Sequence, residues 1–414
     1  MLLLCWRDST HPQGGGSERY LEHVADGLAA AGHTVVFRTS RSPGAARSEI
    51  APSGVRYSRA GGRFTVYPLA LLAMALGRFG VGPLGVLRRP HVVVDTQNGV
   101  PFFARLATTS PVVVLVHHIH REQWPVAGPV VAPIGWFIES WLAPRVHARS
   151  QYVTVSLPSS EELAGLGVDP ERIAVVRNGL DPLPDDVVSA AGEGPTDETT
   201  GESTLAATGE ATAPRLVVLS RLVPHKHVED AIDVVAALRP RHPGLQLDVI
   251  GSGWWADKLH DYAAERGLLG TGRGGSGDTG GVVFHGFVDE ATKHRVLGAA
   301  TVHLMPSRKE GWGLAVSEAA QHGVPTVGYH HAAGLRDSID DGETGLLTHD
   351  VAAMTDATDN LLADQTRRDR MGEAARRKAS EMSWPATATA MAQVLDAVAA
   401  GRRVSGVISG RTVD

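Results

Sequence analysis

Short runs of β-branched residues alternate with helix-like patterns along the first half of the chain. The segment 17–32 has apolar residues at three- and four-residue spacing and ends at Gly32, which predicts an amphipathic helix. Apolar runs around it predict strands at 2–6, 33–39, 91–96, 111–118 and 152–156. Continuous apolar runs are typical of parallel strands covered on both faces. We therefore expect a doubly wound α/β domain at residues 1–182.

The same alternation returns after a polar segment at 183–214. That segment is rich in Gly, Ser, Thr and acidic residues, and this composition predicts a flexible linker or surface insertion. A second doubly wound domain is expected at 215–383, with a helix and tail at 384–414, and the glycine-rich tract at 267–281 predicts a disordered loop. The predicted strands of this half are 215–221, 245–251, 281–287, 301–306 and 325–329, separated by helices at 228–239, 255–266, 289–299 and 314–323.

Two Rossmann-like domains that face each other across a central cleft are the architecture that this pattern predicts. Ligands of open parallel sheets bind beyond the carboxyl ends of the strands. Candidate chemistry is therefore expected in the loops that lead from a strand to the next helix.

The composition narrows the class of protein. A chain of 414 residues with 43% apolar and 20% charged residues is neither wholly disordered nor a membrane bundle. The net charge of −6 provides no global basic field for nucleic acid. A single cysteine, Cys5, leaves no intramolecular disulfide and no multi-cysteine metal site. We expect a cytoplasmic protein.

One long apolar stretch, 66–87, needs a separate interpretation. Arg78, several glycines and two prolines interrupt it, which argues against a transmembrane helix. A core helix followed by a turn is the interpretation that its length favours. Because arginines flank the stretch, a weak peripheral contact with anionic lipid is the alternative.

The loop at 11–19 joins the first predicted strand to the first helix. Its glycines allow the backbone to approach a ligand, and the helix start that follows favours anions. Gly14 and Gly16 fit the first two positions of a dinucleotide fingerprint, but Arg19 occupies the third, which disfavours a nicotinamide cofactor. A structural tight turn is the alternative.

Two further loops carry charged residues at strand ends. Arg221 and Lys226 follow the strand at 215–221, where two fixed cations can offset the charge that grows on a departing diphosphate. Glu310 and Glu318 frame the start of the helix at 314–323, whose first amides favour an anion. The alternatives are solvated basic residues on a loop and a glutamate that stabilises the helix dipole.

Three histidines lie at the carboxyl end of the strand predicted at 111–118. His117, His118 and His120 suggest zinc, but consecutive strand residues point to opposite faces, and we expect no nearby acid to complete a site. A histidine that hydrogen-bonds a sugar hydroxyl fits this strand end better. A buried structural histidine is the competing interpretation.

Taken together, these segments resemble the retaining family 4 glycosyltransferases of GT-B fold. The resemblance covers nearly the whole chain outside the two low-complexity tracts. It implies transfer of a glycosyl unit from a nucleotide sugar to a carbohydrate acceptor, with retention at the anomeric carbon. Its marks are GGSE at 15–18, histidine at 117, RNGLD at 177–181, R-x4-K at 221–226 and E-x7-E at 310–318.

The resemblance also implies roles for individual residues. Arg221 and Lys226 would bind the donor diphosphate with the backbone of Gly16, Glu310 would hold the sugar hydroxyls, and Glu318 would accept hydrogen bonds from the ribose. The donor-binding set is Gly16, Arg221, Lys226, Gly251, Gly253, Glu310, Gly311, Gly313, Leu314 and Glu318, in which Gly251 and Gly253 would permit close approach of the donor. The catalytic set is His117, Arg221, Lys226 and Glu310, and the acceptor-side or sugar-side set is Glu18, His118 and His120.

By this resemblance the expected reaction needs no cofactor and no metal, because the chain has no Asp-x-Asp pair and its cations can carry the charge. A front-face route suits these residues better than a carboxylate nucleophile. GDP-mannose is the preferred donor, since many actinobacterial members are mannosyltransferases and the Arg- and Ala-rich composition is typical of a high-GC genome; UDP-glucose and UDP-N-acetylglucosamine follow. A nucleotide-sugar epimerase and a non-catalytic sugar-nucleotide-binding protein are the alternatives. The acceptor and the oligomeric state are not predicted.

Overall fold

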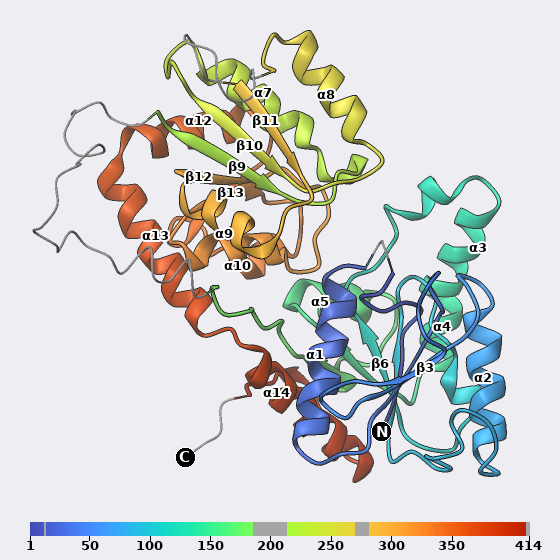
Figure 1. Ribbon diagram of the computed structural model, residues 1–414. Coiled ribbons are helices and arrows are strands. Elements are labelled where there is room, and N and C mark those ends of the chain that lie inside the picture. Colours follow the sequence, from blue (N-terminus) through green and yellow to red (C-terminus); the bar gives the residue numbers. More distant parts are fainter. Residues whose placement is uncertain (12–13, 185–212, 270–280, 411–414) are drawn as a thin grey trace, which may run out of the picture. The chain divides into compact units, whose positions relative to one another are not determined.

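The computed structural model describes residues 1–11, 14–184, 213–269 and 281–410, which form two compact units (Figure 1). The first unit combines Met1–Asp181 with Met382–Asp414, and the second spans Pro182–Glu381. Each is an α/β unit built on a parallel sheet, as predicted. The expected linker at 183–214 and the glycine tract at 267–281 fall, apart from their ends, outside the described residues.

A nine-stranded sheet forms the core of the first unit, in the order β15-β8-β7-β6-β5-β1-β2-β4-β3. All neighbours are parallel except β3 and β4. The strands are β1 (Leu2–Leu4), β2 (Val36–Thr39), β3 (Ser48–Ile50), β4 (Arg56–Arg59), β5 (Val93–Thr96), β6 (Val112–Val116), β7 (Gln151–Thr154), β8 (Ile173–Val175) and β15 (Gly406–Val407). Every residue of β1, β5 and β6 is buried, which explains their uninterrupted apolar sequences.

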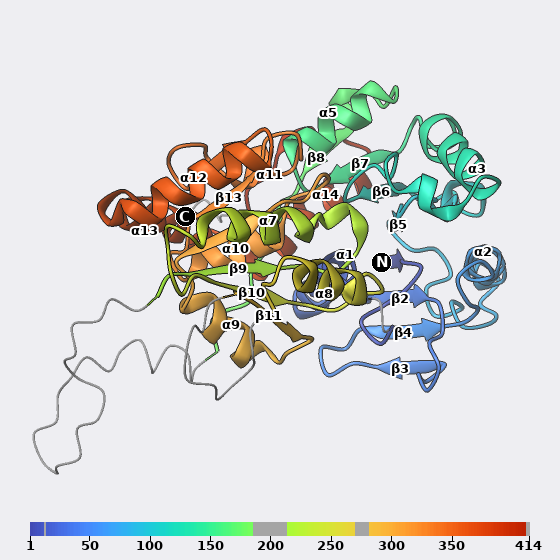
Figure 2. The ribbon, with the colours of Figure 1, turned by 90° about the horizontal axis from the view of Figure 1, so that it is seen from above.

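Helices cover both faces of this sheet (Figures 1 and 2). On one face α1 (Gly16–Ala30) packs against α14 (Trp384–Ala399), so that the end of the chain returns to the first unit. A Cβ at Gly27 would lie 2.3 Å from the Cβ of Ala388, which shows how closely these two helices approach. The other face carries α2 (Val66–Gly77), α3 (Val131–Phe137), the π-helical turn η3 (Ile138–Leu142), α4 (Ala143–Val146) and α5 (Leu157–Gly165).

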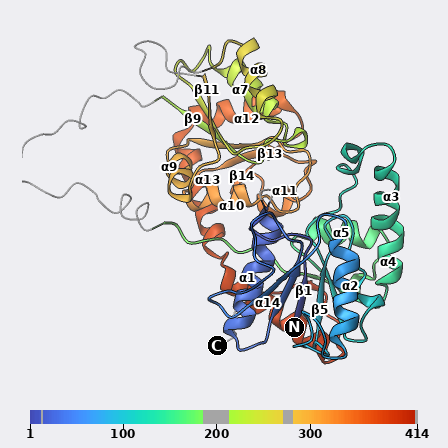
Figure 3. The same cartoon turned by 45° about the vertical axis from the view of Figure 1, so that its right-hand side comes forward.

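The second unit contains a fully parallel sheet in the order β11-β10-β9-β12-β13-β14. Its strands are β9 (Arg215–Leu219), β10 (Gln246–Ile250), β11 (Gly281–Gly286), β12 (Val302–Met305), β13 (Thr326–Tyr329) and β14 (Gly345–Thr348). Its helices are α7 (Val228–Leu238), α8 (Ala256–Glu265), α9 (Glu290–Gly298), α10 (Leu314–Gln321), α11 (Leu335–Ser338), α12 (Val351–Ala363) and α13 (Gln365–Ser380). Figure 3 shows α7, α8 and α12 on one side of this sheet and α9 and α10 on the other.

The strand order gives each sheet a topological switch point. In the second unit β9 lies between β10 and β12, so the chain leaves β9 toward one side and later returns on the other. In the first unit β1 lies between β2 and β5 in the same way. Ligands of such sheets bind at this switch point, beyond the carboxyl ends of the strands.

The strands that the pattern did not predict are short or polar. The hairpin of β3 and β4 is one example, because β3 is exposed along its whole length and carries no apolar face. β8, β14 and β15 have two to four residues each. Runs this short give no periodic signal.

Candidate functional site

A lysine and a glutamate meet at the switch point of the second unit. Lys226 ends the turn Pro224–Lys226 after β9, and Glu310 lies in the loop after β12. The Lys226 Nζ donates a hydrogen bond to Glu310 Oε1, and the two side chains are only 13% and 10% exposed. The fold thus brings together two residues that are 84 positions apart and that the sequence analysis assigned to the donor diphosphate and the donor sugar.

The two loops are also joined through the backbone. The amide of Arg308 donates to the carbonyl of His225 at 3.0 Å. Burial lowers the pKa of the His225 imidazole to about 4, and the charges of Lys226 and Arg221 act in the same direction. His225 is therefore neutral near pH 7, and the positive charge of this loop comes from Lys226 and from Arg221, an exposed residue.

The helix that follows Glu310 presents its amino end at the same edge of the sheet. Gly313 is the N-cap of α10 and has a φ of +88°, a left-handed conformation that favours glycine. No side chain caps α10 within the described chain. The first-turn amides, beginning at Leu314, can therefore bind an anion. The carbonyl of Glu310 accepts a hydrogen bond from Gly334 at 3.2 Å, which fixes the loop that includes Gly311.

Glu318, on α10, contacts a lysine that the sequence analysis did not identify. Lys293 of α9 donates to Glu318 at 3.0 Å and to Glu290 at 2.6 Å. Burial alone would lower the pKa of Lys293, but Glu318 and Glu290 together raise it. This lysine therefore stays charged and orients Glu318. The sequence around Lys293 does not predict this contact, because Glu318 is 25 residues away on another helix.

Gly251 and Gly253 pack against the backbone of a neighbouring loop, whereas the sequence analysis expected them to permit close approach of the donor. A Cβ at Gly251 would lie 1.8 Å from the carbonyl oxygen of Ser220, and one at Gly253 would lie 2.1 Å from that of Leu222. The close approach that requires glycine is thus made by the loop that carries Arg221. These glycines shape the site through that loop.

In the first unit, His117 lies directly beyond β6 and is buried. Its ring meets Tyr20 edge-on with centroids 5.1 Å apart. Neither ring nitrogen has a hydrogen-bond partner among the described residues. Burial lowers the pKa of His117 to about 4, so its imidazole is neutral near pH 7. A buried imidazole without a partner is suited to receiving one from a ligand.

His118 and His120 lie side by side, with ring centroids 4.3 Å apart. An acid does lie beside His120, because the chain turns back in η3 and buries Glu139 there. Glu139 accepts hydrogen bonds from the amide and Nδ1 of His120 at 3.1 and 3.0 Å, and from Trp124 Nε1 at 2.7 Å. Gln123 donates to His118 Nε2 at 3.1 Å. Within the described part of the chain, however, no cluster of three or more ligating side chains could hold a metal ion.

Glu18 caps its own helix. Its carboxylate is fully buried, accepts from the amide of Gly15 at 2.8 Å and pairs with Arg7 at 2.8 Å. This arrangement holds the amino end of α1, which begins at Gly16, rather than presenting an open ligand for a sugar. Residues 12–13 of the same loop lie outside the described ranges.

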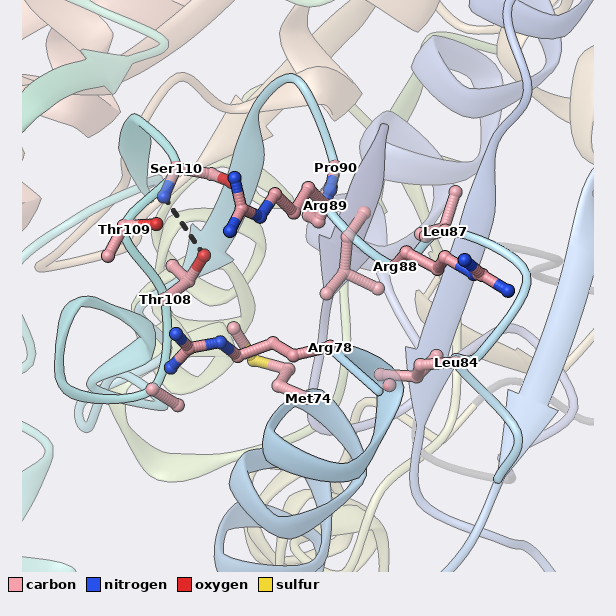
Figure 4. Close-up of a pocket in the computed structure, with 13 residues that line it drawn as sticks. Met74, Arg78, Leu84, Leu87, Arg88, Arg89, Pro90, Thr108, Thr109 and Ser110 are labelled. Carbon is pink, nitrogen blue, oxygen red and sulfur yellow. Dashed lines mark hydrogen bonds between the residues drawn. The ribbon is translucent and has the colours of Figure 1, made fainter. Parts of the chain in front are cut away.

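A pocket lies at the opposite, amino edge of the first sheet (Figure 4). Leu2 at the start of β1 lines it together with Pro90 and Ser110, which precede β5 and β6. The side chains of Arg78, Arg88 and Arg89 also line it. Because ligands of these folds bind at the carboxyl edge, this pocket is separate from the candidate active site.

Two family models match the chain. The model described as Glycosyltransferase Family 4 matches residues 14–182, and the model described as Glycosyl transferases group 1 matches residues 206–378. The glycogen synthase of Mycobacterium tuberculosis (strain H37Rv) is 30% identical over 94% of this chain and 92% of its own length. The D-inositol 3-phosphate glycosyltransferase of Corynebacterium glutamicum is 30% identical over 58% of this chain and 54% of its own.

A third relative is the GDP-mannose-dependent alpha-(1-6)-phosphatidylinositol monomannoside mannosyltransferase of Mycolicibacterium smegmatis. It is 33% identical over 46% of this chain and 48% of its own length. Among solved structures, the sucrose-phosphate synthase of Thermosynechococcus elongatus superposes with a TM-score of 0.75 at 19% identity, covering 97% of this chain and 99% of its own. HepE of Anabaena, solved with UDP and glucose, gives 0.66 at 16% identity, covering 95% and 98%.

Proposed function

The chain belongs to the family 4 glycosyltransferases of GT-B fold and is a hexosyltransferase, and from this premise we propose that it moves a hexosyl unit from a nucleotide sugar to a glycan or glycoside acceptor, with retention and α configuration. The observation that carries the proposal is the pairing of Lys226 with Glu310 at the switch point of the second unit.

Each member of this pair would gain a new partner when the donor binds. The donor diphosphate would replace Glu310 as the partner of Lys226, and Arg221 would add a second positive charge from the same loop. Glu310 would then accept hydrogen bonds from the sugar hydroxyls. The uncapped amides of α10 would face the same diphosphate, and Glu318, oriented by Lys293, would accept from the ribose.

These groups support a front-face transfer. The bond from the anomeric carbon to the diphosphate oxygen breaks, and the acceptor oxygen bonds to that carbon on the same face. The proton of the acceptor hydroxyl passes to the departing diphosphate oxygen. Lys226, Arg221 and the α10 amides would stabilise the negative charge that grows on the leaving group. In this proposal the positive charge that stabilises the leaving diphosphate comes from Lys226, Arg221 and the α10 amides.

Histidines of the first unit could hold a carbohydrate hydroxyl at the carboxyl edge of their own sheet. His117 is neutral near pH 7, and its two unpartnered nitrogens can both donate to and accept from a hydroxyl. Glu139 holds His120 through Nδ1, so its Nε2 would be the nitrogen that binds a hydroxyl. We assign these contacts to His117 and His120 by hydrogen-bonding capacity.

The names of two relatives support two different nucleotide-sugar donors. The mycolicibacterial relative is named as GDP-mannose-dependent, which supports GDP-mannose, the donor that the sequence favours. A relative that matches along nearly the whole chain is named a glycogen synthase, which supports a glucosyl donor. Both are hexosyl donors with a diphosphate, so the proposed site serves either.

A thermal-shift screen of GDP-, UDP- and ADP-sugars against the full chain tests the donor. We expect one nucleotide to raise the melting temperature more than the others, because a ligand that binds only the folded state stabilises it. NMR of the product of that donor with a glycoside acceptor should show an α-anomeric proton. A β-anomer would refute retention, an epimerised donor formed without acceptor would identify an epimerase, and absence of any shift would refute the donor site.

A further inference from the structure

Positive charge is concentrated on one part of the first unit. Residues 60–150 contain eight arginines and three acidic residues, in a chain whose net charge is −6. Two of these acids, Asp95 and Glu139, are fully buried, which leaves Glu122 as the exposed acid of the segment. The surface built from this segment is therefore strongly basic. The arginines are Arg63, Arg78, Arg88, Arg89, Arg105, Arg121, Arg145 and Arg149.

The outward side of α2 is apolar although it is exposed. Leu69, Leu72 and Leu76 lie at three- and four-residue spacing, which places them on one stripe of the helix. The opposite stripe, which includes Ala70, Ala73 and Met74, packs on the sheet. Leu72 is 55% exposed, a large exposure for a leucine inside a helix.

The apolar stripe continues into the loop that follows α2. Phe79 is 80% exposed, and Val81 and Val86 are each 55% exposed. We call these residues, together with Leu69, Leu72 and Leu76, the α2 face. Contiguous apolar surface of this kind marks a contact with another molecule or with a membrane.

Three arginines border the α2 face. Arg78, Arg88 and Arg89 line the pocket of Figure 4, and all three are exposed. Their guanidinium groups form no ion pair with any acidic residue of the described ranges. Thr108 adds a hydroxyl to the same pocket, which accepts a hydrogen bond from the Ser110 amide at 3.0 Å and can itself donate to a ligand. The pocket thus offers cationic and neutral hydrogen-bond donors, which together suit a phosphate.

Aromatic residues extend the same side of the sheet beyond α2. Phe137 and Trp141 stack at 5.0 Å, and Arg145 lies over the Trp141 ring at 4.2 Å. Both aromatic side chains are more than 40% exposed. Tryptophan and arginine on one helical surface are typical of the boundary between water and lipid.

From this arrangement we propose that the α2 face docks on a membrane surface that contains anionic phospholipid. The side chains of Leu72 and Phe79 enter the boundary between headgroups and acyl chains, and Arg78, Arg88 and Arg89 bind headgroup phosphates. Charge complementarity selects this occupant, because a basic rim around an apolar stripe matches an anionic bilayer. The proposal concerns the amino edge of the first sheet and does not depend on the transfer reaction.

Vesicle flotation of the full chain tests this surface. We expect binding to vesicles of phosphatidylcholine mixed with phosphatidylglycerol, weaker binding to phosphatidylcholine alone, and release at high salt. R88E/R89E should reduce partitioning at least about 20-fold, because each arginine near an anionic surface contributes about fivefold. L72S/F79S should also reduce it, on vesicles of either composition.

A charge-matched variant, R56E/R370E, controls for net charge, since both of its arginines are exposed and neither belongs to the α2 face or lines the pocket of Figure 4. It should bind vesicles like the unaltered chain, and all three variants should keep their transfer activity toward a soluble acceptor. An equal loss of binding in R56E/R370E, or no binding at all, would overturn the proposal. Two other results would also overturn it. One is that the unaltered chain forms a dimer without vesicles and that L72S/F79S dissociates this dimer. The other is that inorganic phosphate stabilises the chain, that R88E/R89E removes this stabilisation, and that neither the unaltered chain nor any variant binds vesicles.

Discussion

A lysine and a glutamate that share a hydrogen bond can serve the fold, the reaction or both. Lys226 and Glu310 are nearly buried, so each neutralises the other when no ligand is present. Removing one partner leaves the other as an unpaired charge, which costs stability even if neither residue takes part in the reaction. Only a double variant separates the two roles.

We predict that K226M and E310Q each lower the free energy of unfolding by about 1–3 kcal/mol, because each leaves a partly buried polar group without its partner. The double variant K226M/E310Q should recover most of that loss. Turnover should behave differently, since K226M removes a group that stabilises the leaving diphosphate, which is worth about 2.7–4 kcal/mol of barrier. Urea denaturation and kcat/KM of the three variants measure the two effects.

The turnover of the double variant can also refute the proposed donor site. Turnover restored together with stability would show that the pair is structural and that the charge on the leaving group is stabilised elsewhere. Turnover that stays low while stability returns is the result that a donor site predicts.

The sequence predicts the residues of this pair but not their supporting partners. Lys226 and Glu310 stand directly after predicted strands, and neighbouring strand ends meet at one edge. Glu139 and Lys293 could not be predicted in this way, because their partners are 19 and 25 residues away across a change of element. The sequence of η3 has no hydrophobic periodicity that predicts the turn in which Glu139 is buried. Glu18 is intermediate, since its capping contact is local and readable from spacing.

At the scale of elements, buried parallel strands were predicted well and peripheral ones poorly. β6 and β9 are apolar because both of their faces are covered, and this fixes their sequences. β3 is exposed along its length and pairs with β4 through its backbone and the Glu49–Arg59 ion pair, so its sequence shows no apolar run. In the loops between elements, a glycine can be required where two backbone segments approach closely, as at Gly251.

We predict that G251A destabilises the second unit and disturbs the loop that carries Arg221. An added Cβ would meet the Ser220 carbonyl at 1.8 Å, and Gly251 has a φ of +130° that side chains rarely adopt. G342A is the matched control, because Gly342 also has a positive φ of +80° but open space around its Cα. G342A should cost about 1 kcal/mol, and G251A clearly more, together with weaker nucleotide-sugar binding. Chemical denaturation and calorimetric titration measure both, and equal effects of the two variants would show that the close approach has no consequence.

At the scale of the whole molecule, the two units share a sensitivity to acid. Besides His11 and His23 of the first unit, burial lowers the pKa of five histidines by a large amount, His117 and His147 in the first unit and His225, His303 and His322 in the second. The lowered values are about 4, and about 3 for His303. Between these values and the ordinary pKa near 6.5, the unfolded chain binds protons that the folded chain does not. The stability that these histidines permit is therefore complete above pH 6.5 and is lost as the pH falls toward 4.

Asp95 acts in the opposite direction. Its burial raises the pKa of the carboxyl group to about 6, although amide hydrogen bonds from Ala104 and Phe102 lower it in part. The folded chain therefore takes up this proton before the unfolded chain does, which stabilises the first unit as the pH falls from 6 toward 4. In the first unit two carboxyl groups with a raised pKa, Asp95 and Glu22, oppose four histidines with a lowered pKa. Among the described residues of the second unit, no carboxyl group with a raised pKa opposes the three histidines.

We therefore predict that the urea midpoint of unfolding falls between about pH 7 and about pH 5, and that the second unit loses stability first. Fluorescence and far-UV circular dichroism across the transition should separate as the pH falls, because one unit then unfolds before the other. D95N should be less stable at every pH, since an amide cannot accept both backbone hydrogen bonds with the strength of a carboxylate. It should also show a steeper loss toward pH 5, because one of the two opposing carboxyl groups of the first unit has been removed. A midpoint that is constant or rises toward pH 5 would contradict the assignment of these histidines as buried and neutral.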